Sequence, residues 1–301
     1  MLLGSQGSRA SPPLGFSLRG VRLRRIGAPL APQPGGAVVF GLEHLPLGFG
    51  LALRELRSRY QESALGFLWV LLSPLMMIGI YSMFFGRVLG MNESVKAPGG
   101  FTLYLFAGYL AWDLFGRMAG EGGDIFLGNR SILTKVRLPL DAIMQARILY
   151  HIFHWLFATI VLFVVMLFMG VWPSWSALLL PLVVLDLALF TIGVSSLFAV
   201  LSLFLKDFKE VLGILLVAWL FATPIFYDAR NLGILGSGRI EGVLYQMNPM
   251  FHFVELMRSC TIYGNWPTLL SLGSVTVGSL LVYLAGRAFL MRSRPLILDL
   301  L

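Results

Sequence analysis

The sequence is poor in charged residues and in cysteine. Only 13% of its 301 residues are charged and 57% are apolar, whereas about a quarter of the residues in a soluble domain are charged. A chain of this composition is expected to be an integral membrane protein. Cys260 is the single cysteine, which excludes a disulfide within the chain.

Motifs for nucleotide binding and for hydrolysis are missing as well. The sequence contains no G-x-x-x-x-G-K-[S/T] phosphate loop, so energy from ATP would have to come through a partner. It has no Ser-His-Asp set, H-E-x-x-H helix or paired carboxylates at a common membrane depth, and we assign it no catalytic, cofactor or metal site. His151 and His154 share a helix face, but no Cys or carboxylate accompanies them in sequence, so we expect packing or hydrogen bonding.

Basic residues outnumber acidic ones, which gives a formal net charge of +8 at pH 7. Lys and Arg beside apolar spans set membrane topology, and we prefer this interpretation to nucleic-acid binding. Residues 1–45 are rich in Gly, Pro, Ser and Arg and have no apolar periodicity. We expect a disordered cytosolic tail there, with an organelle transit peptide as the alternative.

The first long apolar stretch is preceded by an amphipathic one. Phe49, Leu53 and Leu56 recur at helical spacing opposite charged residues, which predicts an interfacial helix over 46–62. Residues 63–86 carry no charge, and at about 1.5 Å per residue they span roughly 36 Å, enough to cross a bilayer. The junction therefore marks the cytoplasmic start of the membrane domain.

Residues 63–301 are predicted to form an all-α domain with six transmembrane helices. Most Lys and Arg lie in the tail, in a basic loop over 117–141, in the fourth loop and at the C-terminus. Both termini and the 117–141 loop are therefore predicted to be cytoplasmic, and the mixed segment 228–267 to lie outside. The predicted spans cover residues 63–86, 101–118, 148–170, 176–205, 211–227 and 268–289.

Four ordered stretches resemble one family, the permease subunits of ATP-binding-cassette exporters for polysaccharides of the O-antigen, capsule and teichoic-acid type. The resemblance covers about residues 48–290. Lys206 and Thr223 depart from the residues common in that family, Arg and Ser. The matching stretches are RYQESALGFLWVLLSPL from Arg59, ILTKVRLPL from Ile132, KDFKEV followed by TPIFY from Lys206, and NPMFHFVELMR from Asn248.

The resemblance implies a homodimer of permeases in the bacterial inner membrane, docked on two cytosolic ATPase subunits that bind ATP and Mg²⁺. The cargo would be a lipid-linked glycan. A coupling helix is implied within 117–141, for which a solvated connector is the alternative, and re-entrant helices that gate the outer side are implied within 228–267. Residues expected to contact the ATPase are Phe126, Ile132, Leu133, Lys135 and Arg137, and those expected at the outer gate are Tyr227, Asn248 and Pro249.

Aromatic residues are frequent in the first two spans, where the resemblance places the translocation path. Trp69, Tyr81 and Tyr109 are our candidates for contact with cargo, because ring faces pack on the C–H faces of sugars. Interfacial belts and ordinary packing use the same residue types, and this alternative stays open. Asp186 is the deepest charge, either a hydrogen-bond partner between helices or a channel residue.

We therefore predict a permease subunit of an ATP-driven polysaccharide exporter. An ATP-cassette exporter of drugs or lipids would share the same fold. An ion-coupled carrier should have ionisable residues deep in several spans, and an intramembrane glycosyltransferase or hydrolase should have clustered acids on one loop. Neither feature is evident in the sequence.

Overall fold

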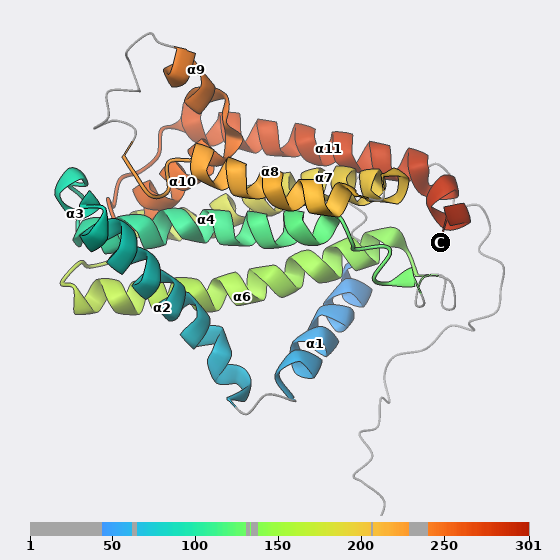
Figure 1. The fold of residues 1–301 in the computed structure, drawn as a ribbon, viewed down its shortest axis with the longest axis horizontal. Coiled ribbons are helices and arrows are strands. Elements are labelled where there is room, and N and C mark those ends of the chain that lie inside the picture. The colour runs from blue at the N-terminus through green and yellow to red at the C-terminus, as the bar shows by residue number, and fades with distance from the viewer. Residues whose placement is uncertain are drawn as a thin grey trace, which may run out of the picture. The chain divides into compact units, whose positions relative to one another are not determined.

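The computed structural model describes residues 44–61, 65–130, 133, 138–205, 207–228 and 240–300, and the regular structure within them is helical (Figure 1). Residues 1–43 of the predicted tail lie outside this set. The α-helices are α1 (Leu45–Gln61), α2 (Trp69–Tyr81), α3 (Met91–Ser94), α4 (Gly100–Gly122), α6 (Leu140–Phe168), α7 (Leu180–Phe204), α8 (Phe208–Ala222), α9 (Ile240–Met247), α10 (Pro249–Cys260) and α11 (Leu269–Leu300). Three shorter elements are η2 (Gly66–Leu68), η3 (Ser82–Val88) and η4 (Trp175–Leu179).

Four helical stretches are long and apolar enough to cross a membrane, and they match the first, third, fourth and sixth predicted spans. The second and fifth predicted spans are also helical, as α4 and α8. However, α4 contains Asp113, Arg117 and Glu121, and α8 has only 15 residues. The six-span count therefore remains a prediction. The four stretches are Gly66–Val88, Leu140–Phe168, Trp175–Phe204 and Leu269–Ile297.

Three helix ends differ from the predicted ones for local reasons. α6 begins at Leu140, directly after the extended Pro139, because a proline at a helix start sacrifices no intrahelical hydrogen bond. α8 ends at Ala222 because the residue before Pro224 takes an extended conformation. α11 continues past the predicted end to Leu300, since most residues that follow Arg287 are good helix formers.

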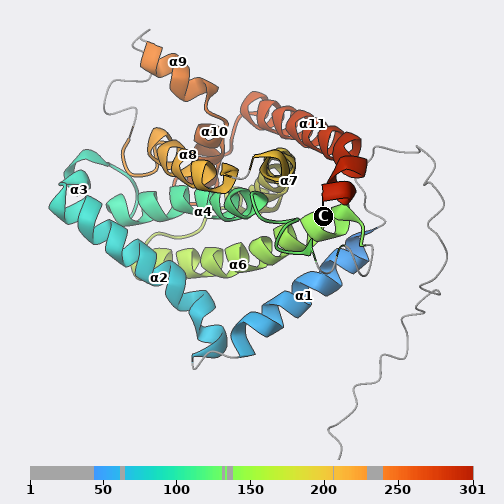
Figure 2. The same cartoon turned by 45° about the vertical axis from the view of Figure 1, so that its right-hand side comes forward.

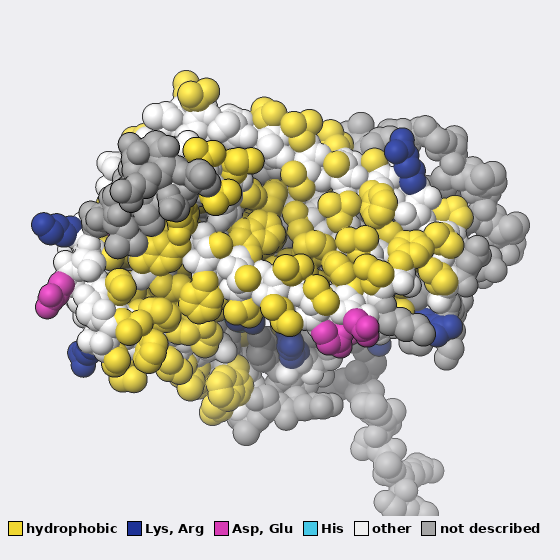
Figure 3. Space-filling view, turned by 45° about the horizontal axis from the view of Figure 1, so that its top comes forward, with side chains coloured by type: hydrophobic (Ala, Val, Ile, Leu, Met, Phe, Trp, Pro, Cys, Tyr) yellow, Lys and Arg dark blue, Asp and Glu magenta, His cyan; other side chains and the backbone are white. Residues whose placement is uncertain are grey.

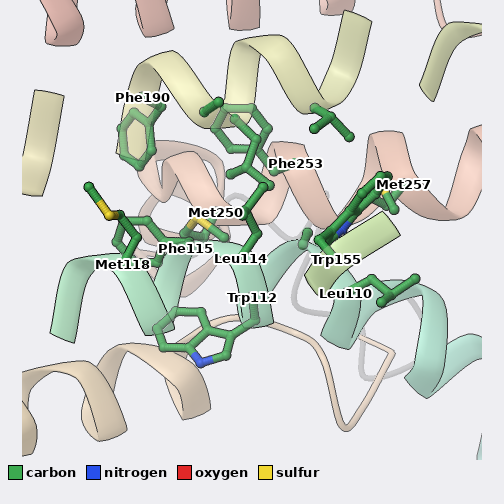
Figure 4. Close-up of a cluster of buried hydrophobic side chains, with 14 of the residues drawn as sticks. Leu110, Trp112, Leu114, Phe115, Met118, Trp155, Phe190, Met250, Phe253 and Met257 are labelled. Atoms are coloured by element: carbon green, nitrogen blue, oxygen red, sulfur yellow. The ribbon is translucent and has the colours of Figure 1, made fainter. Parts of the chain in front are cut away.

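The core is built around α4, which packs against α6, α7, α8 and α10 (Figure 1). Apolar side chains cover nearly all sides of α4, as expected of a helix that is surrounded by others. Figure 4 shows α4 side chains meeting those of α7 and α10. Buried members of this contact are Trp112, Leu114, Phe115 and Met118 of α4, Phe190 of α7, and Met250, Phe253 and Met257 of α10.

α7 and α11 approach each other closely at two glycines. A Cβ added at Gly286 would lie 2.1 Å from the carbonyl oxygen of Gly193, and one added at Gly193 would lie 2.4 Å from that of Val282. Helices in membranes reach such separations only where small residues face each other. A larger side chain at either glycine would force the two backbones apart.

α1 runs beside the first half of α6 (Figures 1 and 2). Gly48 permits this contact, because a Cβ there would lie 2.9 Å from Cβ of Gln145. Leu56 is buried in the contact, whereas Phe49 and Leu53 are exposed. The apolar residues of α1 therefore divide between a packed face and an open face, and the interfacial position of the helix remains a prediction.

Candidate translocation site

Two of the three residues predicted to contact cargo lie together. The ring centroids of Tyr81 on α2 and Tyr109 on α4 are 5.6 Å apart. Phe226, in the turn after α8, lies 5.5 Å from Tyr81 and stacks on Phe85 at 4.3 Å. These edge-to-face and stacked arrangements are the ones that aromatic rings prefer. We call this group the aromatic cluster: Tyr81, Phe84, Phe85, Tyr109, Phe221 and Phe226.

The aromatic cluster has a packed base and an open rim. Phe226 is buried, and Tyr81 and Tyr109 are half-buried. Phe84 and Phe221 are 48% and 52% exposed. A ligand with C–H faces, such as a sugar ring, can therefore contact the rim without displacing the base.

A π-helix, η3, positions the part of the cluster that follows α2. Such segments are rare and occur frequently at functional sites, because the extra residue changes the direction of the side chains. The hydroxyls of Ser82 and Thr102 lie 2.5 Å apart and join η3 to α4. Gly86 is packed tightly, since a Cβ there would lie 2.7 Å from the side-chain oxygen of Asn92.

Trp69 and Asp186 do not belong to the aromatic cluster. Trp69 begins α2 and is exposed, about 18 Å from Tyr81 along the helix axis. Asp186 is buried on α7 and accepts a hydrogen bond of 2.7 Å from the hydroxyl of Thr276 on α11. Of the two alternatives for Asp186, this geometry favours the hydrogen-bond partner between helices.

The residues predicted at the outer gate surround the end of α8. Asn248 caps α10 by accepting a hydrogen bond of 3.0 Å from the backbone N–H of Met250, and Pro249 follows as the first helical residue. The Asn248 side chain also accepts from Trp219 Nε1 at 2.9 Å and donates to the hydroxyl of Thr223 at 3.0 Å. Its amide therefore joins the start of α10 to the end of α8.

Tyr227 makes a second connection at the same place. Its hydroxyl donates to the carbonyl oxygen of Phe221 at 3.0 Å and lies 2.6 Å from the hydroxyl of Tyr245 on α9. Its own carbonyl oxygen accepts a hydrogen bond of 3.1 Å from the hydroxyl of Tyr104. Tyr227 thus contacts α4, α8 and α9, and it directly follows Phe226 of the aromatic cluster.

Arg258 on α10 is a buried anchor that the sequence interpretation missed. Its guanidinium lies 3.5 Å from the centre of the Tyr104 ring and donates from Nε to the Tyr104 carbonyl oxygen at 3.2 Å. Nη2 donates to the carbonyl oxygen of Ile225 at 3.1 Å, and Glu255 lies 3.4 Å from Nη1. Gly108 leaves room for it, since a Cβ there would lie 2.6 Å from Nη2. An arginine inside the apolar stretch after Asn248 was the available signal.

A line of polar side chains between α4 and α6 begins next to the aromatic cluster. Asp113 lies one helical turn after Tyr109 on α4, and it accepts a hydrogen bond of 2.8 Å from Arg117 Nε. Nδ1 of His154 on α6 lies 3.8 Å from the other carboxylate oxygen. A buried carboxylate needs a partner, and here Arg117 supplies the charge-assisted hydrogen bond.

The line continues toward α1. Glu121 contacts Nε2 of His151 at 3.0 Å and Nη1 of Arg147 at 3.8 Å, and Arg147 also pairs with Glu55 of α1. Burial alone would raise the pKa of the Glu121 carboxyl, but the hydrogen bond from His151 and the charge of Arg147 lower it. His151 therefore forms a hydrogen bond with a carboxylate, whereas Nδ1 of His154 packs near Asp113 without a hydrogen bond. We call these residues the polar seam: Asp113, Arg117, Glu121, Arg147, His151, His154 and Glu55.

Two residues predicted to contact the ATPase are covered by the chain itself. Phe126 and Leu133 are 1% and 2% exposed and belong to the main hydrophobic core. The chain itself therefore covers both side chains, and their contact with the ATPase stays a prediction. Phe126 lies in the turns that follow α4, whereas Leu133 is helical. Among the residues of this segment that the structure describes, Leu127 is a large apolar side chain that is exposed. Ile132, Lys135 and Arg137 lie outside the described residues.

Comparison with known proteins places the chain among membrane transporters. Residues 49–262 match the family described as ABC-2 type transporter. The O-antigen export system permease protein RfbA of Myxococcus xanthus is 30% identical over 209 residues, which are 69% of this chain and 76% of that protein. RfbA of Klebsiella pneumoniae is 32% identical over 176 residues, 58% of this chain and 66% of that protein. The polysialic acid transport protein KpsM of Escherichia coli is 22% identical over 243 residues, 79% and 90% of the two chains.

The family match begins within α1 and ends two residues after α10. The aromatic cluster, the Arg258 contacts and the polar seam all lie within it, and the match agrees with the resemblance recognised in the four sequence stretches. The chain belongs to the ABC-2 type transporter family.

Proposed function

We propose that this chain is the membrane-spanning permease subunit of an ATP-driven exporter that moves a lipid-linked polysaccharide or oligosaccharide across the bacterial inner membrane. Its similarity to O-antigen and polysialic acid transport proteins supports this cargo class. The structural observation that carries the proposal is the half-exposed aromatic cluster. Neutral rings attract successive sugars without a charge or metal that would hold any one of them tightly.

The conduit is proposed to form between two copies of the chain. Exposed apolar residues continue from the aromatic cluster along α2, η3 and α8, among them Ile80, Met83, Ile214 and Val217. Figure 3 shows a face of the molecule on which hydrophobic side chains cover much of the surface. A second copy related by a two-fold axis would close the open rim and complete the path.

In the membrane, α4 and α8 are proposed to be the second and fifth of six spans, with both termini cytoplasmic. The exposed residues Phe49 and Leu53 of α1 would then rest on the inner membrane surface. Because the sequence has no phosphate loop, two separate ATPase subunits bind ATP and Mg²⁺ and dock on the cytoplasmic side. The loop that contains Leu127, Lys135 and Arg137 is the proposed contact.

The test is export in cells that lack the chromosomal gene. We expect such cells to lose surface polysaccharide and accumulate lipid-linked glycan inside, and the intact gene to restore export. Tyr81→Ala and Tyr109→Ala should slow export while the amount of folded protein changes less. Trp172→Ala is the matched control, because this exposed aromatic residue lies outside the aromatic cluster.

Several results would contradict this function. Unchanged surface polysaccharide in the deletion strain, together with altered sensitivity to drugs, would favour the drug-exporter alternative. Equal loss of export and folded protein in both tyrosine variants would assign the rings to packing. A stable and active complex of one permease with one ATPase subunit, measured by mass in detergent, would exclude the two-fold arrangement.

A further inference from the structure

A groove between α10 and α11 contains no residue of the aromatic cluster, although Pro249 of the predicted outer gate lines one end of it. It consists of two cavities of about 310 and 300 Å³. His252 and Val275 line both cavities, so the two are neighbours along the same groove. Together they form an elongated space that follows α11 from its beginning into the candidate span.

The chemical character of the groove changes along its length. The cavity near the start of α11 is lined by polar groups of Glu255, Ser259 and Thr268 and by the ring of Trp266. The second cavity is lined mainly by apolar side chains, including Phe190. Lining residues extend from Thr268, directly before α11, to Val282 on α11, about 21 Å along the helix direction. A polar entrance followed by an apolar interior matches an amphiphilic ligand.

Ser279 gives an independent sign of a ligand. Its side chain is 2% exposed and lines the apolar cavity. In the part of the chain that the structure describes, its hydroxyl has no hydrogen-bond partner. A buried hydroxyl without a partner is costly, so an acceptor on a bound molecule would stabilise this arrangement.

We propose that the groove binds one zwitterionic glycerophospholipid with an ammonium head group, such as phosphatidylethanolamine. An acyl chain would fill the apolar cavity, and an ester carbonyl would accept from Ser279. The ammonium would lie near the carboxylate of Glu255, one oxygen of which also lies 3.4 Å from Arg258 Nη1. The charge argues for this class, because no Lys or Arg is present among the described residues that line the two cavities. Leu270 and Leu281 on α11 are exposed, as expected where bilayer lipid reaches the helix.

Native mass spectrometry of the purified full-length chain tests this site, with phosphatidylethanolamine, phosphatidylglycerol and phosphatidylcholine supplied in equal amounts. Gly278→Leu is the main variant, because a Cβ at Gly278 meets no atom within 4 Å and the leucine would occupy the apolar cavity. Gly273→Leu is the matched control: it lies on the same helix, has equal space around its Cβ, and is absent from the cavity lining.

We expect the wild type to retain one phosphatidylethanolamine per chain. Gly278→Leu should reduce the bound fraction about tenfold, since a tenfold change equals about 1.4 kcal/mol, less than the burial of two methylene groups. Gly273→Leu should retain lipid as the wild type does. Ser279→Ala, which creates no steric conflict, should weaken retention in the same direction even if Gly278→Leu folds poorly. Glu255→Gln should reduce the preference for phosphatidylethanolamine over phosphatidylglycerol.

Equal retention in Gly278→Leu and Gly273→Leu would overturn the site, and so would a wild type that retains no lipid or prefers phosphatidylglycerol. A cysteine placed at position 278 in a Cys260→Ser chain gives a further check. Disulfide cross-linking between two chains through this position would identify the groove as an interface between copies instead. None of these readouts depends on export, so they remain informative if the proposed cargo is wrong.

Discussion

Arg258→Met is predicted to destabilise the chain at a buried position outside the aromatic cluster. Methionine has a similar length but removes the guanidinium donors to the carbonyl oxygens of Tyr104 and Ile225. The Tyr104 carbonyl keeps its donor within α4, so the unpaired buried acceptor is that of Ile225, which costs about 1–3 kcal/mol, and the lost cation–π contact costs about 2 kcal/mol more. Removing the buried charge returns desolvation energy but takes the cation away from the Glu255 carboxylate, and with these two effects offsetting each other the net destabilisation is about 3 kcal/mol.

The melting temperature and the export rate should both respond. At roughly 2–4 °C per kcal/mol for a large domain, the purified variant should melt about 6–12 °C below the wild type. Ile225 is the neighbour of Phe226, so the loosened turn should also misplace a ring of the aromatic cluster and slow export. Arg258→Lys keeps the charge but not the planar arrangement of donors. We expect its melting temperature and export rate to lie between those of the wild type and Arg258→Met.

The control for this prediction is Arg87→Met, because Arg87 is an exposed arginine at the end of η3. It should change neither melting nor export. If Arg258→Met melts at the wild-type temperature, the two hydrogen bonds and the ring contact contribute no net stability. If it melts lower but exports normally, the turn with Phe226 is held in place by other contacts, such as those of Tyr227.

Three further predictions concern other parts of the chain. Gly286→Ala should lower the folded yield, because its Cβ would lie 2.1 Å from the Gly193 carbonyl oxygen, whereas Gly273→Ala should not. The pKa of the Glu121 carboxyl is lowered from its ordinary value of 4.5, so the ionised carboxylate stabilises the fold above pH 4.5. This stabilisation is lost as the pH falls through the lowered pKa of the folded state. In pH-dependent melting, acid should therefore weaken the wild type more than Glu121→Gln. Burial raises the pKa of the Cys260 thiol to about 11, so maleimide at neutral pH should label the chain only after unfolding; rapid labelling would contradict the buried position.

The lengths of the apolar runs predicted where the long helices lie, but they did not predict which side chains are buried. The spans that became α6, α7 and α11 could be found because long uncharged runs have few alternatives to a membrane helix. The burial of Phe126 could not be found in this way, because it lies in a turn, and a turn has no periodicity that shows which side chains point inward. The apolar character of the loop was recognised correctly, but its covering partner is the chain itself.

Only some residues of the candidate site could be predicted, namely those whose type and place in a span indicated their role. Tyr81 and Tyr109 were selected as rings on neighbouring spans, and the structure brings them together. Phe226 and Arg258 were not selected, because their partners lie far away in sequence and those of Arg258 are mainly backbone carbonyls. The polar seam was also hidden, since Arg117 was assigned to a loop and its spacing from Asp113 on one helix face was therefore not considered.

The glycine contact between α7 and α11 restricts how the transporter moves. Sliding one helix past the other by a turn would place Val282 or Leu290 opposite the Gly193 carbonyl, where even a methyl group does not fit. We therefore expect the two helices to keep one arrangement during a transport cycle. Displacement would then occur at α2 and α8, whose outer faces are exposed. Spin labels on α7 and α11 should keep one separation with and without nucleotide, while a label pair between α7 and α8 should not.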